Sequence, residues 1–160
     1  MKYRTLVLTS VAGMALVGCS FNPFRAEPTP TPSPSPQDVL GIQEQIESET
    51  GIPVQLPEDG ANMALQDVSN SGSRAVVNTN KSGNITVIAD LPASDSGKDY
   101  NVWLQKADGT AVKVGSLSVV KGGYVLEGKG QTEGAKKVIV SQDSEGAAAP
   151  EQVVLEGTLQ

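Results

Sequence analysis

Asn-Ile-Thr-Val-Ile-Ala-Asp-Leu, residues 84–91, is the stretch that decides the fold, because its side chains follow a period of two. One face of this stretch is wholly apolar and consists of Ile85, Val87, Ala89 and Leu91. Thr86 and Asp90 fall on the opposite face. Since successive side chains of a strand point to opposite faces, the pattern predicts a β-strand with one buried side.

Seven further segments share this character, since each is short, rich in valine or isoleucine, and bounded by turn residues. They are 64–68, 74–79, 100–106, 112–120, 123–127, 136–141 and 152–159. The turn signals between the segments are 70–72, 81–83, 94–97, 108–109, 121–123 and 144–146. No helical pattern separates the segments. We therefore predict an all-β domain over 61–160, an antiparallel immunoglobulin-like β-sandwich of about seven to eight strands.

Two local signals refine this prediction. Asp108-Gly109 lies between two strand patterns, which is the strongest short signal of a β-hairpin in the chain. Gly115 lies midway through 112–120, where the apolar face changes sides, and this predicts a β-bulge.

The segment before the strands, 37–60, is predicted to be a short helix followed by an extended connector. Apolar residues of 37–50 fall mainly on one helical face, and Gly51 supplies a stop signal. Pro53 and Pro57 then favour extended backbone. We expect this amphipathic piece to pack on the edge of the domain or on a partner.

Residues 27–36 read Glu-Pro-Thr-Pro-Thr-Pro-Ser-Pro-Ser-Pro and hold five of the ten prolines. Alternating proline disfavours helix at each intervening residue, so the segment is predicted to be extended polyproline II. At about 3.1 Å per residue it would form a stalk of about 30 Å. With Cys19, residues 19–36 are thus predicted to be a lipidated, proline-rich stalk. Recognition by a proline-binding domain, or glycosylation, is the alternative use of this segment.

The chain begins with a basic start, Met1 to Arg4, and an apolar run, Thr5 to Val17. That run is too short to cross a bilayer, which takes about 20 apolar residues, and is typical of a secretory signal. Leu16, Val17 and Gly18 before Cys19 resemble the lipobox of bacterial lipoproteins. The resemblance implies a signal peptide over 1–18 and a diacylglycerol, with acyl chains such as palmitate, on the Cys19 sulfur. An ordinary signal peptide or a short membrane helix is the alternative.

Composition narrows the function classes. The chain has no histidine and one cysteine, which leaves out the usual metal ligands and most nucleophilic triads. We expect no metal, no cofactor and no enzyme activity. The net charge of −6 argues against nucleic-acid binding, which needs a basic surface. An acidic protein also gains nothing from anionic lipid headgroups, so the lipid on Cys19 would have to hold it to the membrane.

Several short motifs follow one another along the second half of the chain. They are Leu-Pro at 91–92, Gly-Lys-Asp-Tyr-Asn-Val-Trp-Leu at 97–104, Asp-Gly at 108–109, Gly-Ser-Leu at 115–117, Val-Ile-Val at 138–140, Ala-Pro at 149–150 and Val-Val-Leu-Glu-Gly at 153–157. Together they resemble the extracytoplasmic C-terminal domain of the anti-sigma-K factor family, over roughly 74–159. What the resemblance implies is the fold rather than the regulation.

The chain departs from that family in two ways. The family carries a cytoplasmic sigma-binding domain and a transmembrane helix before this domain, and we find neither pattern here. We therefore expect that this chain does not itself sequester a sigma factor. The Glu-Pro that follows the valine-rich strand in the family is replaced here by Ser141-Gln142.

Trp103 and Tyr100 are the aromatic candidates for binding a partner. Trp103 is the only tryptophan, and alternation places it with Asn101 and Gln105, opposite Tyr100. It would contact a sugar, a peptide or a protein, or else belong to a second core layer, as tryptophans of β-sandwiches often do.

These observations predict a lipid-anchored protein on the extracytoplasmic face of the cell membrane. It would present a non-enzymatic β-sandwich for structural or partner-binding roles, with an envelope protein or a polysaccharide as partner. Two alternatives are an accessory or sensory ectodomain linked to anti-sigma-type signalling, and a small-ligand carrier. An exposed apolar patch would favour a partner, and a concave cavity with a few polar groups would favour the carrier.

Overall fold

A computed structural model describes residues 36–159. The predicted signal peptide, the lipobox, Cys19 and all but the last residue of the predicted stalk lie outside the described residues. Their assignments therefore remain predictions.

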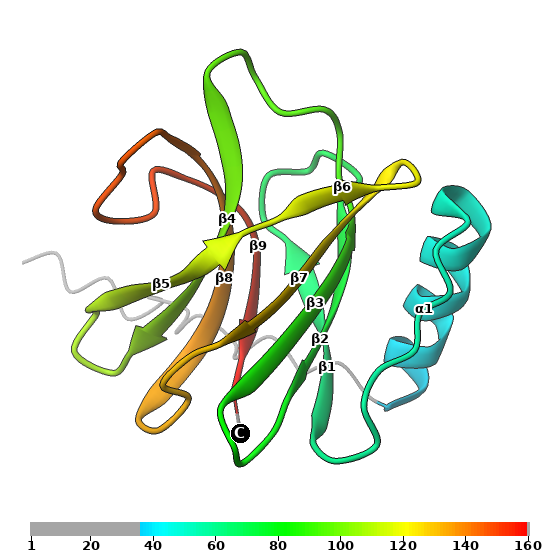
Figure 1. The fold of residues 1–160 in the computed structure, drawn as a ribbon, viewed down its shortest axis with the longest axis horizontal. Coiled ribbons are helices and arrows are strands. Elements are labelled where there is room, and N and C mark those ends of the chain that lie inside the picture. Colours follow the sequence, from blue (N-terminus) through cyan, green and yellow to red (C-terminus); the bar gives the residue numbers. More distant parts are fainter. Residues whose placement is uncertain (1–35, 160) are drawn as a thin grey trace, which may run out of the picture. The chain divides into compact units, whose positions relative to one another are not determined.

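The described residues form one helix and nine strands (Figure 1). The helix is α1 (Pro36–Thr50), where a helix over 37–50 is predicted from the sequence. The strands are β1 (Ala61–Asp67), β2 (Arg74–Thr79), β3 (Asn84–Asp90), β4 (Lys98–Lys106), β5 (Ala111–Ser116), β6 (Ser118–Val120), β7 (Gly123–Lys129), β8 (Ala135–Ser144) and β9 (Gln152–Thr158). Each predicted segment is a strand, except that 112–120 divides into β5 and β6 at Leu117, which raises the number to nine.

All nine strands belong to one antiparallel sheet, in the order β5-β4-β8-β9-β1-β2-β3-β7-β6. This differs from the predicted sandwich of two separate sheets. The difference comes from β1, whose residues 61–65 pair with β2 while Gln66 and Asp67 pair with β9. One strand thus joins the two halves, and the sheet curls into a nearly closed barrel. In Figure 1, β5 and β6 follow one another across its front, and they are the two edges of the sheet.

The main core lies inside this curled sheet, and strand alternation supplies it. Val77 of β2, Val87 of β3, Leu104 of β4 and Val140 of β8 are among its buried members. The predicted inward face of 84–91 is confirmed, because all four of its apolar residues belong to this core. Burying such side chains is the main favourable term in folding.

Helix α1 covers the outer face of β1, β2 and β3, and this makes a second, smaller core. Val39 and Ile46 of the helix join Val76 and Ile88 of the sheet, and Ile52 of the connector extends the cluster. The helix ends where predicted: Gly51 has a φ of 68°, and its N–H donates to the Glu47 carbonyl at 2.9 Å. The helix therefore packs on the domain itself rather than on a partner.

The turn chemistry also agrees with the sequence. Asp108-Gly109 forms the hairpin between β4 and β5, with Gly109 at a φ of 86°. In the β4–β5 ladder Val102 faces Gly115 while Trp103 faces Lys113, so one extra residue, Val114, lies between them. This is the β-bulge predicted at Gly115.

We predict that Ile46→Ala lowers the free energy of unfolding by about 2–5 kcal/mol, because it empties a fully buried site between helix and sheet. Leu40, on the same helix but 61% exposed, is the matched control, and Leu40→Ala should change stability by no more than about 0.5 kcal/mol. Urea unfolding of the purified chain followed by circular dichroism measures both. Equal effects of the two variants would show that the helix does not pack as described.

Candidate functional site

Tyr100 and Trp103, the predicted partner-binding aromatics, are both buried. Tyr100 lies in the main core and meets Tyr124 edge-on, with ring centroids 5.1 Å apart at 79°. Trp103 is 2% exposed and lies outside that core cluster, as the alternation of β4 predicts. Neither ring is presented to a partner in this structure. Trp103 instead fills an outer packing layer, which is the alternative role considered for it.

A buried carboxylate, Asp143 on β8, organises the surroundings of Trp103. Its Oδ2 accepts hydrogen bonds from Trp103 Nε1 at 2.9 Å, Asn101 Nδ2 at 2.9 Å and Ser141 Oγ at 2.8 Å. Its Oδ1 accepts the Glu151 backbone N–H at 2.8 Å. Four donors satisfy a carboxylate that has no solvent exposure. The arrangement fixes the end of β8 against β4 and the segment before β9.

The electrostatics of Asp143 follow from these contacts. Burial alone would raise the pKa of this carboxyl group, because desolvation disfavours its charged form. The hydrogen bonds from Glu151, Asn101, Ser141 and Trp103 outweigh that effect and hold the pKa below its ordinary value. The group is therefore charged at neutral pH and fully engaged, which is the state of a structural residue rather than of an acid–base catalyst.

Sequence reasoning missed this network. It ended the strand at Ser141, whereas β8 continues to Ser144. The polar run Ser-Gln-Asp-Ser at 141–144 resembles a loop. The partners of Asp143 on β4 lie far away in the sequence, Asn101 42 residues and Trp103 40 residues before it. Ser141 and Gln142, where the chain departs from the family pattern, are both buried.

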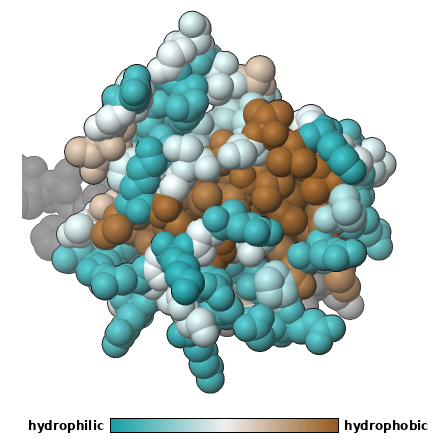
Figure 2. Space-filling view, viewed as in Figure 1, coloured by the Kyte–Doolittle hydropathy of each residue, from teal (hydrophilic) through white to brown (hydrophobic). Residues whose placement is uncertain are grey.

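The first exposed candidate is the outer edge of β6, which we call the edge surface and define as Val119 and Val120. Val119 is 67% exposed and Val120 41%. Within residues 36–159, β6 pairs only with β7, so one side of its backbone has no strand beside it. Figure 2 shows hydrophobic residues gathered on this face of the domain. An exposed apolar patch on an edge strand is a feature of interaction sites.

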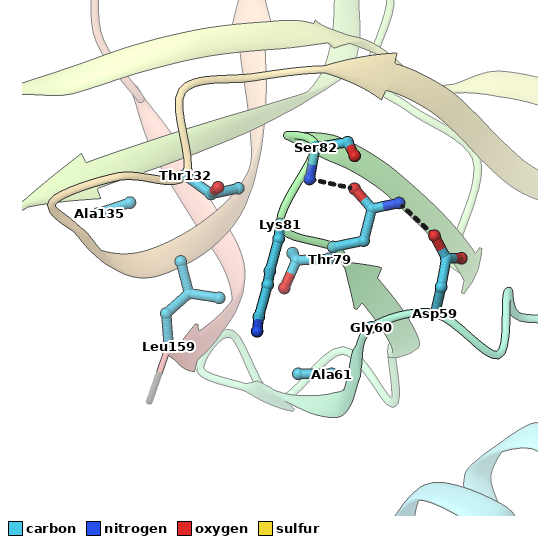
Figure 3. Close-up of a pocket in the computed structure, with 10 residues that line it drawn as sticks. Asp59, Gly60, Ala61, Thr79, Lys81, Ser82, Thr132, Ala135 and Leu159 are labelled. Carbon is cyan, nitrogen blue, oxygen red and sulfur yellow. Dashed lines mark hydrogen bonds between the residues drawn. The ribbon is translucent and has the colours of Figure 1, made fainter.

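The second candidate is a cavity of about 690 Å³ at the opposite end of β7, which we call the end cavity (Figure 3). Four separate segments contribute to it: the start of β1, the β2–β3 turn, the β7–β8 connection and the end of the described chain. Its lining residues are Asp59, Gly60, Ala61, Thr79, Asn80, Lys81, Ser82, Thr132, Ala135 and Leu159. The local sequence pattern does not indicate this cavity, because the four segments lie far apart in the sequence and share no motif.

The walls of the end cavity are fixed by side-chain hydrogen bonds. Asn80 Oδ1 accepts the backbone N–H groups of Ser82 at 3.1 Å and Asn84 at 2.9 Å. Asn80 Nδ2 donates to Asp59 Oδ2 at 3.0 Å, which ties the turn to the connector (Figure 3). The β2–β3 turn is thus held in one conformation from both sides.

Close backbone approaches fix the same walls. A Cβ at Gly60 would lie 2.5 Å from the Thr79 carbonyl oxygen, so only glycine lets the connector approach β2 this closely. Gly130 donates its N–H to the Gly83 carbonyl at 2.9 Å, and a Cβ at Gly83 would lie 2.8 Å from the Gly130 oxygen. The connection after β7 therefore lies directly against the β2–β3 turn.

The sequence matches the family described as "Anti-sigma-K factor rskA, C-terminal" over residues 6–154. The chain belongs to this family. The match covers the segment that carries the resemblance, 74–159, as far as residue 154, and it begins well before that segment. No curated protein and no solved structure matches the chain.

For an anti-sigma-K factor C-terminal domain, regulation rather than catalysis is the ordinary role. Over residues 36–159, no three histidine, cysteine or carboxylate side chains are grouped so that they would hold a metal ion. In that same range, no helix has the length and apolarity needed to cross a membrane. The two exposed candidates on this family domain are the edge surface and the end cavity.

We predict that Asp143→Asn lowers the free energy of unfolding by about 1–3 kcal/mol at pH 7, because an amide cannot accept all four hydrogen bonds. The folded pKa of Asp143 lies below its ordinary value, so the carboxylate contributes stability above the unfolded-state pKa of about 3.9. That contribution is lost as the pH falls through the folded pKa. The stability gap between wild type and variant should therefore narrow on acidification.

Urea unfolding at pH 7 and pH 3, followed by the fluorescence of Trp103, measures this gap. Asp99 on β4, whose carboxylate is exposed, is the control, and Asp99→Asn should produce little change at either pH. A gap that stays constant between the two pH values would contradict the role assigned to Asp143.

Proposed function

We propose that this protein is a lipid-anchored, extracytoplasmic binding module without enzyme activity, which presents its β-domain to a partner protein of the cell envelope. The observation that carries the proposal is the edge surface: an edge strand with one free side and two exposed valines, on a domain whose family is regulatory. This deepens the alternative of an accessory or sensory ectodomain in anti-sigma-type signalling.

The chemistry of the edge surface selects the kind of partner. The free side of β6 offers backbone N–H and C=O groups in the spacing of a strand, and an extended segment of another chain satisfies them by adding a strand. Val119, pointing outward, gives that segment an apolar contact. A protein strand with apolar side chains fits this surface better than a polysaccharide, which needs polar or aromatic contacts.

The anchor belongs to the same proposal. Leu16, Val17 and Gly18 form the lipobox, residues 1–18 are removed, and Cys19 carries the lipid. Two acyl chains hold a protein at a membrane stably, whereas one chain does not. The stalk of 19–36 then separates the domain from the headgroups, so that the edge surface faces proteins rather than lipid.

We predict that an alkyne fatty acid labels the wild-type protein and that Cys19→Ser abolishes both the label and membrane retention. Globomycin, which blocks the lipoprotein signal peptidase, should leave the wild-type leader attached. Gel fluorescence after click labelling and membrane fractionation are the measurements. A Cys19→Ser protein that remains in the membrane unlabelled would show that the leader is an uncleaved anchor.

We also predict that a photoreactive amino acid at Val119 gives a discrete cross-linked adduct in intact cells. Leu40 is the matched control, because it is another apolar residue of similar exposure, 61% against 67%, on the exposed side of α1. The adduct should disappear when Val120 is changed to lysine, which puts a charge on the edge. Adducts of equal yield at Leu40 and Val119 would contradict docking at the edge surface.

A small-ligand carrier remains the second candidate, and the end cavity is the observation that favours it. This cavity is lined by polar and aliphatic residues and lies at one end of the single curled sheet.

A further inference from the structure

The end cavity has the dimensions and construction of a ligand site. Pockets that bind small molecules are commonly about 300–1,000 Å³ and largely pre-formed, and this one measures about 690 Å³. Its walls are held by the Asn80 hydrogen bonds and by glycine contacts that leave no room for a side chain. A pre-formed cavity costs a ligand little in ordering of the protein.

Lys81 is the only cation that lines the cavity. Figure 3 shows its side chain extending into the cavity from the β2–β3 turn. Among the described residues the ion pairs join Arg74 with Glu49 and Asp90, and Lys137 with Glu156, so none of them involves Lys81. Asp59, the lining carboxylate, already accepts a hydrogen bond from Asn80. The lining therefore holds two charged groups: the Lys81 ammonium group, and the Asp59 carboxylate, which Asn80 ties to the β2–β3 turn.

The remaining lining has two kinds of surface. Thr79, Ser82 and Thr132 are lining residues that carry hydroxyl groups, and a hydroxyl group can donate to an oxygen anion. Ala61, Ala135 and Leu159 contribute aliphatic surface. No lining residue is aromatic, so a sugar ring or a nucleobase finds no side chain on which to stack. The lining has one lysine, no arginine and the carboxylate of Asp59, so it favours a ligand with one negative charge over the two of a phosphate monoester.

We propose that the end cavity binds a small aliphatic carboxylate. Its carboxylate group pairs with Lys81 Nζ and accepts from the hydroxyl groups, while its hydrocarbon chain lies on Ala61, Ala135 and Leu159. This site is independent of the lipid anchor and of the edge surface, which lies at the other end of β7. It gives the domain a small-molecule input that the partner-binding proposal does not require.

Hexanoate is the probe, and hexanamide is its uncharged isostere. In an amide ¹H–¹⁵N NMR titration of the full chain, hexanoate should produce saturable shifts centred on Gly60, Ser82 and Thr132. Hexanamide should bind at least about tenfold more weakly, because it lacks the charge that strengthens the hydrogen bonds. Lys81→Gln should weaken hexanoate binding by about tenfold as well.

Two further variants separate this site from non-specific effects. Lys129→Gln removes an exposed lysine at the same end of the sheet that does not line the cavity, and it should bind hexanoate like wild type. Ala61→Phe fills the cavity from an exposed position and should abolish binding without touching the charge. Undisturbed amide dispersion shows that each variant is folded. Shifts that do not saturate, equal binding of hexanamide, or full binding by Lys81→Gln or Ala61→Phe would overturn the proposal.

Discussion

The pairing of β1 with two different strands is the constraint on which the rest of the structure depends. Residues 61–65 pair with β2, and Gln66 and Asp67 pair with β9. The backbone hydrogen bonds of this one strand therefore join the two halves into a single sheet. The halves must then curl around a shared core, since each buries its inner face against the other. Curling brings the two edge strands, β5 and β6, next to each other, so that the buried Leu117 alone connects them. The unpaired edge is thus a consequence of how the sheet closes.

Most of the local structure could be predicted from the sequence, because it is set by local physics. The period of two located every strand, and glycine or asparagine at positive φ marked the turns, as at Asn70 and Gly109. The strand order could not be predicted. Whether two separate sheets or one curled sheet form depends on where a single strand, β1, changes partner, and Gln66 carries no signal that distinguishes the two outcomes.

The candidate sites show the same division. Alternation correctly placed Trp103 on the face of β4 that points away from the main core. It could not indicate that the indole N–H would donate to a buried carboxylate forty residues later in the chain. Exposed valines on β6 lie in a segment that resembles a buried strand, since pattern alone does not distinguish an edge strand from a central one. The end cavity depends on four segments brought together only by folding. Its residues, such as Lys81 and Thr132, belong to turns that look ordinary along the sequence.

β7 runs between the two exposed candidates, with the edge surface beside its first residues and the end cavity beyond its last. Its seven residues span about 23 Å at about 3.3 Å each, so a strand added to β6 and a molecule in the cavity do not compete for space. Communication between them would have to pass through β7 itself, whose inward residues Tyr124 and Leu126 pack against the main core. Coupling between two distant sites requires an element with two discrete arrangements that both sites bias. We therefore expect the proposed docking at the edge surface and the proposed ligand binding in the end cavity to act separately.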